Sequence, residues 1–506
     1  MTSADGVAIA SSTKMAADAG AEVAREGGNA VDAAIAAAWA AAVAEPGICA
    51  PGCGGFVTVW APDADPVTID GYIEMPGRGL PRERFGTGTR EVHLEYGGGV
   101  TLHVGYGSVG TPGGPAALER ASGEYGRVPW RILLEPAIEL ARRGFPLTAA
   151  ARHYLEYSAE PVFGWHPDSR RALHREDGSL KGEGETIHVE HLAESLERLA
   201  SHGASDLYTG EIGRAVAADV QANGGLLTAE DLAAYEPIVR PSSTGVVDGW
   251  TVATNPPPAI GGVTLGAMLG LMVGRPRGEW TEDDVIHLVD VQARVLGFRR
   301  ERVDLREDVV AAIDELRAAF ASPSTVHTST VDGDGLGCAI TLSAGYGSGV
   351  MVPGTGLWLN NCLGEVELNR RGLHAWPVGA RLVSNMAPTV ARSPAGAVLA
   401  IGSPGADRIT TAILQVFVNH ASAGMALQEA VDHPRLHVED TDAGPRVAAE
   451  PGVPDPVDID MPRRRFDARS MYFGGVGVAS WSDEDGLRAA ADPRRASAST
   501  IVPAAD

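Results

Sequence analysis

The sequence predicts a single interwoven α/β body rather than a string of separate domains. Helical and strand-like segments are mixed from one end of the 506-residue chain to the other, and no low-complexity linker or internal repeat divides them. The composition is that of a globular protein, with 44% hydrophobic residues, 21% charged residues, and 63 Gly and 33 Pro for the turns. Length alone would suggest several domains, but one layered fold can also reach this size.

The N-terminal half is predicted to start with strands and helices and then to become mainly helical. Gly27-Gly28 ends the first helix, and Glu45-Pro46-Gly47 ends the second. We expect strands at 6–12, 56–60, 66–70 and within 85–105, and helices at 13–25, 29–44 and across 115–223, with 132–143 the clearest amphipathic helix.

The C-terminal half returns to strands. Thr228 is a suitable N-cap for a short helix, and Pro256-Pro257-Pro258 breaks the chain before another. We expect strands at 244–254, 325–332, 338–343, from there to about 401 and at the C-terminal end, and helices at 263–272, 281–298, 305–321, 409–420 and 427–432.

The most informative stretch is the hairpin expected at residues 325–343. Thr325 opens its first strand, and a Gly333-Asp334-Gly335 turn leads into the second. If the chain were cut before Thr325, the freed α-amine would lie beside the hydroxyl and could act as its base. From the hairpin alone, a threonine that only packs or caps is the simpler interpretation.

A second glycine-rich feature, Gly402-Ser403-Pro404-Gly405, lies directly before the helix expected at 409–420. A tight turn at a helix start presents unpaired backbone N–H groups, which suit an oxyanion. A plain strand-to-helix turn is the alternative, and the local pattern by itself favours it.

Charge and residue usage argue against several classes of function. The formal net charge of −24 argues against nucleic-acid and anionic-membrane partners. Lys14 and Lys181 are the only lysines, so a lysine Schiff base or a phosphate-loop lysine is not expected. There is no signal-like segment at the N-terminus and no apolar run long enough to span a bilayer, so we expect a soluble, cytoplasmic protein without a membrane partner.

No metal or cofactor is expected either. The four cysteines, at positions 49, 53, 338 and 362, lack a nearby histidine pair and are expected to be reduced thiols. The segment His188-Val189-Glu190-His191 has none of the usual zinc spacings, and the G-x-G-x-x-G at 105–110 does not open a helix. No serine lies in a G-x-S-x-G elbow, so a serine hydrolase of the α/β type is not supported.

Several motifs, taken together and in order, resemble one family. In the C-terminal half they are Thr325-x-His327-x-Ser329-x-Val331-Asp332, Val352-Pro353-Gly354-Thr355-Gly356, Leu359-Asn360-Asn361, Met386-Ala387-Pro388-Thr389 and Gly402-Ser403-Pro404-Gly405. In the N-terminal half they are Gly27-Gly28-Asn29-Ala30-Val31-Asp32, Gly110-Thr111-Pro112-Gly113 and Gly261-Gly262-Val263-Thr264. Over nearly the whole chain they are similar to the γ-glutamyltransferase (γ-glutamyltranspeptidase) family.

The resemblance implies an α+β fold, the four-layer αββα sandwich of two mainly antiparallel sheets of the N-terminal-nucleophile hydrolases. It implies one interwoven precursor, residues 1–506, that cuts itself between Ser324 and Thr325. The large chain, 1–324, and the small chain, 325–506, then stay associated. Thr325 becomes the nucleophile and its new α-amine the base, Ser343 is the hydroxyl that hydrogen-bonds the nucleophile, and the Gly405 and Ala406 N–H groups form the oxyanion hole.

Departures from the family pattern concentrate where the amino-acid end of the substrate binds. The carboxylate-binding Arg is missing from Tyr72-Ile73-Glu74-Met75, and Arg78 is the nearest candidate to replace it. The amine-binding Asp corresponds to Glu365, and Asn361, shortly before it, is also expected to bind substrate. The paired serines correspond to Ser384 and Asn385, which are expected at the substrate too. An asparagine expected soon after Ser343 is missing, and the segment 362–383 is short, which favours the absence of a covering lid. Losing an Arg–carboxylate contact would lower affinity by roughly one to two decades.

We therefore interpret the chain as a self-processing threonine hydrolase or acyltransferase. It would attack a carbonyl of a small amide or related acyl substrate through an acyl-enzyme, with altered, non-glutathione specificity and no cofactor. A role in specialised metabolism, including hydrolysis of C–C bonds next to a carbonyl, fits the same nucleophile. Two alternatives stay open: an ordinary γ-glutamyl hydrolase or transpeptidase acting on glutathione-like substrates, and a catalytically inactive binding relative. The sequence also leaves the oligomeric state open.

Overall fold

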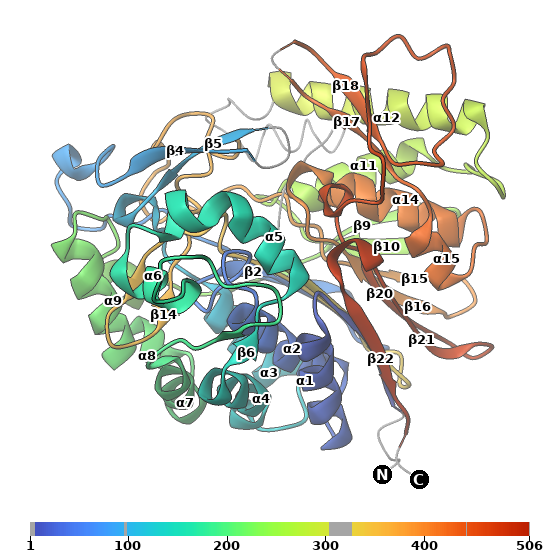
Figure 1. The fold of residues 1–506 in the computed structure, drawn as a ribbon. Coiled ribbons are helices and arrows are strands. Elements are labelled where there is room, and N and C mark those ends of the chain that lie inside the picture. Colours follow the sequence, from blue (N-terminus) through green and yellow to red (C-terminus); the bar gives the residue numbers. More distant parts are fainter. Residues whose placement is uncertain (1–5, 96–98, 303–325, 442, 505–506) are drawn as a thin grey trace.

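The computed structural model describes residues 6–95, 99–302, 326–441 and 443–504, and its centre is a pair of stacked β-sheets (Figure 1). The larger sheet has seven strands in the order β22 (Ala498–Val502), β1 (Val7–Ser11), β11 (Val326–Asp332), β12 (Gly337–Ser343), β2 (Gly54–Trp60), β3 (Val67–Gly71) and β8 (Ile238–Pro241). The smaller has six in the order β21 (Gly486–Ala491), β20 (Gly477–Ser482), β16 (Val398–Gly402), β15 (Thr389–Arg392), β10 (Trp250–Thr254) and β9 (Ser243–Val247). Neighbouring strands within both sheets are antiparallel.

Helices cover the outer face of each sheet. On one side α2 (Ala30–Ala44) lies against β11 and β12 and packs on α1 (Lys14–Arg25) and α4 (Trp130–Arg143). On the other side α11 (Gly261–Leu271) and α14 (Ile409–Ala421) pack together and against the six-stranded sheet. This helix–sheet–sheet–helix order confirms the predicted αββα sandwich.

The remaining elements surround these layers. The other helices are α3 (Gly114–Tyr125), α5 (Ala149–Ser158), α6 (Pro167–Leu173), α7 (Leu192–His202), α8 (Ser205–Tyr208), α9 (Glu211–Ala222), α10 (Ala229–Ala233), α12 (Glu282–Arg302) and α15 (Leu427–Asp432). Three two-stranded sheets pair β4 (Arg90–Leu94) with β5 (Val100–Val104), β6 (Phe145–Pro146) with β7 (Thr186–Ile187), and β13 (Met351–Val352) with β14 (Leu357–Trp358). A three-stranded sheet has the order β17 (Leu436–Glu439), β18 (Arg446–Ala449) and β19 (Arg463–Arg465).

Small side chains explain how closely the layers approach. All 15 residues of α2 are buried, and most are alanines, so the helix can lie flat against the sheet. Asn29 caps it by accepting hydrogen bonds from the Val31 and Asp32 N–H groups, while Asp32 accepts one from the Asn29 N–H. Alanine and valine side chains also fill the space between the two sheets. The strand β11 is therefore covered by α2 on one face and by the six-stranded sheet on the other.

The positions of most predicted elements agree with the structure. The region 85–105, expected to hold one strand, contains the hairpin β4–β5. The helix expected at 305–321 lies outside the described residues, and the division into chains 1–324 and 325–506 stays a prediction. The four cysteines are free and buried. Within the described part of the chain, no helix is both long and apolar enough to cross a membrane.

Candidate active site

The strand of the candidate nucleophile begins directly after Thr325. Ser324 and Thr325 lie outside the described residues, and the structure resumes at Val326, the first residue of β11. Val326 pairs with Leu342 of β12, so Ser343, the next residue of β12, lies at the end of β11 that connects to Thr325. The Ser343 hydroxyl accepts a hydrogen bond from the N–H two residues on (2.9 Å), which fixes the turn after β12.

His327, on the same strand, is held as a neutral structural residue. It is buried, with Nδ1 2.9 Å from the Thr341 hydroxyl and Nε2 2.6 Å from the Ser329 hydroxyl. Burial lowers the pKa of His327 to about 3, so the ring is uncharged near neutral pH. A Cβ added at Gly402 would come 2.3 Å from the ring carbon Cε1. The histidine therefore joins β11 to the end of β16, and only glycine leaves it room.

The turn after β16 holds Gly405 and Ala406, the predicted oxyanion-hole residues, and their role there stays a prediction. Gly405 and Ala406 have φ values of 136° and 55°, and for Ala406 this left-handed backbone is strained. Neither backbone N–H donates a hydrogen bond to any residue that the structure describes. Ser403 fixes the turn, because its hydroxyl donates to the Pro404 carbonyl (2.6 Å) and accepts from the Gly475 N–H (3.0 Å). Two free donors held in a rigid turn suit an oxyanion.

Asn360 and Asn361 connect this region to the N-terminal half. The Asn361 side-chain oxygen accepts from the Tyr346 N–H (2.7 Å), and its nitrogen donates to the His103 carbonyl (3.3 Å). The Asn360 side chain accepts from the Gly110 N–H and donates to the Gly110 carbonyl, both at 3.0 Å. Asn361, predicted to bind substrate, thus also positions the loop that follows β12.

Glu365 and Ser384 lie beside one buried cluster. Tyr72, Cys362, Leu363, Leu382 and Met386 pack together in it, so the segments that carry Glu365 and Ser384 meet there. Glu365 is 2% exposed, and its Oε1 has no hydrogen-bond partner among the described residues. Burial, and after it the charge of Glu367, raises the pKa of Glu365 to about 8. The carboxyl group therefore keeps its proton near neutral pH until a ligand supplies a positive charge.

Ser384 and Asn385 form part of a buried segment that packs on the start of α11. The Ser384 carbonyl accepts hydrogen bonds from the N–H groups of Ile260 (2.7 Å) and Gly261 (3.1 Å). A Cβ added at Gly261 would come 2.2 Å from the Asn385 carbonyl oxygen. The backbone of both predicted binding residues is therefore fixed by the helix behind them.

The place that the resemblance assigns to a carboxylate-binding arginine is apolar. Ile73 is completely buried, and its side chain lies against Gly54 and Gly110, where an added Cβ would come 2.9 Å and 2.2 Å from Ile73 atoms. Arg78, the predicted replacement, pairs with Asp231 (3.1 Å) and Glu74 (3.6 Å). The charge of Arg78 is therefore already matched, and its role in binding stays a prediction.

A second arginine beside Ile73 was not predicted. Arg381 pairs with Glu74 (3.2 Å) and Asp70 (3.6 Å) and lies over the ring of Tyr235, with 4.2 Å between Cζ and the ring centroid. It also donates to the Tyr72 carbonyl (3.1 Å). Carboxylates thus neutralise both arginines on this side of the site.

Two further interacting pairs of side chains were not predicted, because no local sequence motif marks them. The Tyr346 hydroxyl donates to Glu367 (2.8 Å), across 21 residues of chain. Asp407 pairs with Arg408, directly after the candidate oxyanion turn, and lies 3.6 Å from Nε2 of His437. The sequence offered one indication, which is that these residues lie close to predicted site residues: Glu367 follows Glu365 by two residues, and Asp407 directly follows Ala406.

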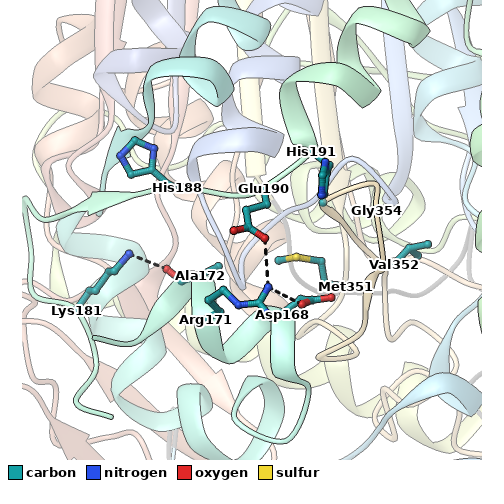
Figure 2. Close-up of a pocket in the computed structure, with 11 residues that line it drawn as sticks. Asp168, Arg171, Ala172, Lys181, His188, Glu190, His191, Met351, Val352 and Gly354 are labelled. Carbon is teal, nitrogen blue, oxygen red and sulfur yellow. Dashed lines mark hydrogen bonds and ion pairs between the residues drawn. The ribbon is translucent and has the colours of Figure 1, made fainter. Parts of the chain in front are cut away.

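A separate charged pocket of about 250 Å³ lies beside α6 and the start of α7 (Figure 2). His188, Glu190 and His191 line it, together with Arg171 and Lys181. Arg171 pairs with Asp168 (2.7 Å) and Glu190 (3.3 Å), so its charge is matched. Among the described residues there is no group of three or more His, Cys, Asp and Glu side chains that could hold a metal ion. None of the pocket residues belongs to the candidate active site.

Known proteins match this chain over most of its length. A family profile described as Gamma-glutamyltranspeptidase matches residues 16–311 and 291–502. The chain belongs to the γ-glutamyltranspeptidase family. It is therefore an enzyme, an N-terminal-nucleophile hydrolase that acts by acyl transfer.

Relatives of this chain include glutathione hydrolases and acylases. The glutathione hydrolase proenzyme of Escherichia coli (strain K12) is 30% identical over 478 residues, which covers 85% of this chain and 80% of the relative. The acylase ACY 1 proenzyme of Pseudomonas sp. (strain SE83) is 29% identical over 511 residues, covering 94% and 90%. A crystal structure of cephalosporin acylase from Bacillus halodurans shares the fold, with a TM-score of 0.79 over 99% of this chain and 96% of that chain, at 24% identity.

Proposed function

We propose that this family member is a self-processing threonine hydrolase or acyltransferase for small acyl amides other than glutathione. Its precursor is cut between Ser324 and Thr325, and Thr325 is the nucleophile of the small chain. The observation that carries the altered specificity is Ile73, a buried apolar residue where the family pattern has an arginine.

The proposed mechanism uses groups at the end of β11. The α-amine freed by cleavage takes the proton of the Thr325 hydroxyl, and the oxygen attacks the substrate carbonyl. The N–H groups of Gly405 and Ala406 donate to the negative oxygen that forms. The ammonium group returns the proton to the leaving amine as the C–N bond breaks, which leaves an ester on Thr325. Water or an acceptor amine then attacks this ester, releases the acyl group and restores the hydroxyl.

The surroundings of Ile73 support a change in the acyl group. A charge-assisted arginine–carboxylate contact contributes about 1.5–3 kcal/mol, and Ile73 cannot make it. Arg78 and Arg381 are matched by Asp231, Glu74 and Asp70. A glutamyl group would therefore bring a carboxylate to a place where no spare positive charge is provided by these arginines.

Gel electrophoresis with N-terminal sequencing tests the processing. The wild-type protein should give two chains, the smaller beginning at Thr325. The Thr325→Ala variant should stay as one chain without activity, whereas Thr325→Ser, which keeps a hydroxyl, should still be cut. An active Thr325→Ala enzyme would contradict the assigned nucleophile, and an uncut, inactive wild type would favour a binding protein.

A chromogenic γ-glutamyl anilide tests the specificity separately. We expect the processed enzyme to release the anilide poorly from this donor, because the α-carboxylate lacks its arginine. Release at the rates of an ordinary γ-glutamyltransferase would show that glutamyl recognition is intact and would overturn the altered specificity without affecting the nucleophile.

A further inference from the structure

The segment 362–383 lies between two groups of predicted binding residues and is held to the N-terminal half near both of its ends. Near its start, the His103 N–H of β5 donates to the Gly364 carbonyl (2.9 Å). Near its other end, the Leu382 N–H donates to the Ile73 carbonyl (2.9 Å). What fixes the part between these contacts therefore bears on the position of the binding residues on either side.

The middle of this segment is held by the side chain of His374, which is 8% exposed. Its Nδ1 accepts a hydrogen bond from the Gly86 N–H (2.8 Å), and its Nε2 donates to the Gly107 carbonyl (2.6 Å). The Phe85 ring packs edge-on against the imidazole, with 6.3 Å between ring centroids. One side chain thus joins the segment to two separate loops of the N-terminal half.

The backbone on both sides of this contact is tightly constrained. His374 has a φ of 58°, a left-handed conformation that is unfavourable for a residue with a Cβ and persists where the surroundings hold it. The Gly107 N–H donates to the Gly88 carbonyl (2.8 Å), and a Cβ added at Gly107 would come 2.3 Å from the Thr87 carbonyl oxygen. The partners of the ring are therefore fixed against each other, and the histidine is fixed against them.

The two bonds require one neutral form of the imidazole. A backbone N–H only donates, so Nδ1 must keep its lone pair for Gly86, and a carbonyl only accepts, so Nε2 must carry the hydrogen. A second proton, on Nδ1, would break the bond from Gly86 and place a charge among buried groups. Burial lowers the pKa of His374 below its ordinary value of 6.5. Both bonds are therefore present at neutral pH, and the Gly86 bond is lost as the pH falls through the lowered pKa.

Other titratable groups lie on the elements that meet at His374. The charge of His103 lowers the pKa of His374 in the same direction as burial, whereas the bond to Gly107 raises it. The nearest other such groups along these segments have contacts of their own. They are Arg84, which donates to the Gly225 carbonyl (3.0 Å), Tyr106, whose hydroxyl lies 3.3 Å from His166 Nε2, and Arg371, whose Cζ lies 5.5 Å from the Trp376 ring centroid.

We propose that His374 is a positioning residue for the donor-binding side of the site. In its neutral form it fixes the middle of the segment 362–383 on the N-terminal half, and its protonation in acid releases this segment and weakens donor binding. The enzyme would then lose affinity for its acyl donor in acid through a residue that touches no substrate. This inference rests on the proposed function, because it assumes that the residues at the two ends of the segment bind the acyl donor.

Hydrogen exchange at Gly86 tests the contact without requiring activity. Exchange of peptides from residues 84–89 is followed by mass spectrometry on the full chain at pH 7.5 and pH 5, with correction for the intrinsic effect of pH. In the wild type, we expect protection of the Gly86 amide to fall about tenfold in acid, as for loss of one hydrogen bond. His374→Gln keeps an acceptor and a donor but gains no proton, so its protection should not depend on pH. His374→Phe should be unprotected at both pH values.

Kinetics then test the link to binding. Butanoyl p-nitroanilide is a suitable probe, because its charge does not change with pH. We expect its KM to rise about tenfold between pH 7.5 and pH 5 in the wild type and to stay constant in His374→Gln. The fall of kcat as the Thr325 α-amine is protonated should be alike in both. His202→Gln, the same change at an exposed position of α7, should behave as the wild type.

Failure of the proposed function and failure of this inference give different results. If Thr325 is not the nucleophile, the wild type and Thr325→Ala will hydrolyse the anilide equally, and exchange alone decides. In His374→Phe, the amides of residues 364–369 and 384–386 should then exchange about tenfold faster than in the wild type at pH 7.5. Unchanged exchange there, or Gly86 protection that does not fall in acid, would refute the inference. A KM that stays constant while Gly86 loses protection would refute the positioning role.

Discussion

The two sides of the candidate site are built from different groups. On one side, β11, β12 and the turn 402–406 present backbone N–H groups, hydroxyls and glycines. On the other, the segment 72–78 and the loop 362–369 present buried side chains whose charges depend on their neighbours. The positions of the groups on the first side depend on the register of two sheets. On the second side, a single substitution can change one group and leave the others in place. The difference indicates how a family can keep its chemistry while it changes the acyl group that it accepts.

The largest expected effect comes from placing the family's arginine on the second side. Ile73→Arg would bury a charge that the surroundings do not pair, so the free energy of unfolding should fall by about 3–5 kcal/mol. Ile73→Leu, which keeps the volume, should cost less than about 1.5 kcal/mol. Denaturant unfolding measures both. A stable Ile73→Arg variant would show that the surroundings of Ile73 can pair the new charge and would contradict the expected loss of stability.

The next effect concerns Glu365 and depends on pH. Its folded-state pKa of about 8 lies above the unfolded value of 4.5, so the folded state binds the proton more tightly between these values. Stability from this group is therefore full below pH 4.5 and is lost as pH rises towards 8. Glu365→Gln removes this loss, and its advantage over the wild type should grow by about 4–5 kcal/mol across the window. Parallel stability curves for the two proteins would show that Glu365 is not held in its buried, protonated form.

A smaller loss is expected on the first side from Gly402→Ala. The added Cβ would lie 2.3 Å from the His327 ring, and relief of such a clash typically costs about 1–3 kcal/mol. Turnover should fall with stability, because the displaced strand end carries the candidate oxyanion turn. Gly123→Ala in α3, which meets nothing within 4 Å, should be neutral or slightly stabilising. Thermal unfolding of the pair would show whether the contact between β11 and β16 is as tight as described.

The smallest effect should come from Ser343→Ala. This change removes the acceptor for the Gly345 N–H, a bond contributing about 1 kcal/mol, and a hydroxyl near the proposed nucleophile. We expect kcat/KM to fall by about tenfold, while Ser343→Thr, which keeps the hydroxyl, stays close to the wild type. If alanine and threonine behave alike, the hydroxyl does not assist the nucleophile.

Local patterns predicted much of the fold. A run of Thr, Ser and Val residues and a glycine turn predicted the hairpin at 325–343, and β12 begins one residue earlier than predicted, while the predicted first residue of β11 lies outside the described part of the chain. The pairing of β1 with β22 could not be predicted in this way, since it joins the two ends of the chain and no local signal specifies it. The layered arrangement came from the family resemblance, which carries long-range information that periodicity lacks.

The family resemblance assigns one part of the candidate site, and burial decides the chemistry of the other part. Ser343, Gly405 and Ala406 were assigned from the resemblance, and their catalytic roles stay predictions. Nothing in the sequence specifies that Glu365 is buried or that Tyr346 reaches Glu367, because both depend on how separate loops fold together. The charge of a buried residue depends on the groups that surround it in the folded protein, and its residue type alone does not determine it.

The strand order of the seven-stranded sheet has a consequence for the life of the processed enzyme. Under the proposed cleavage, β11, β12 and β22 belong to one chain, while β1 lies between β22 and β11 and belongs to the other. The two chains would be interleaved, so partners could not be exchanged between molecules without breaking ladders on both sides of β1. After denaturation, reassembly would require two untethered chains to meet, a concentration-dependent step that the precursor avoids. Maturation would therefore be a one-way event, with the fold completed before the chain is divided.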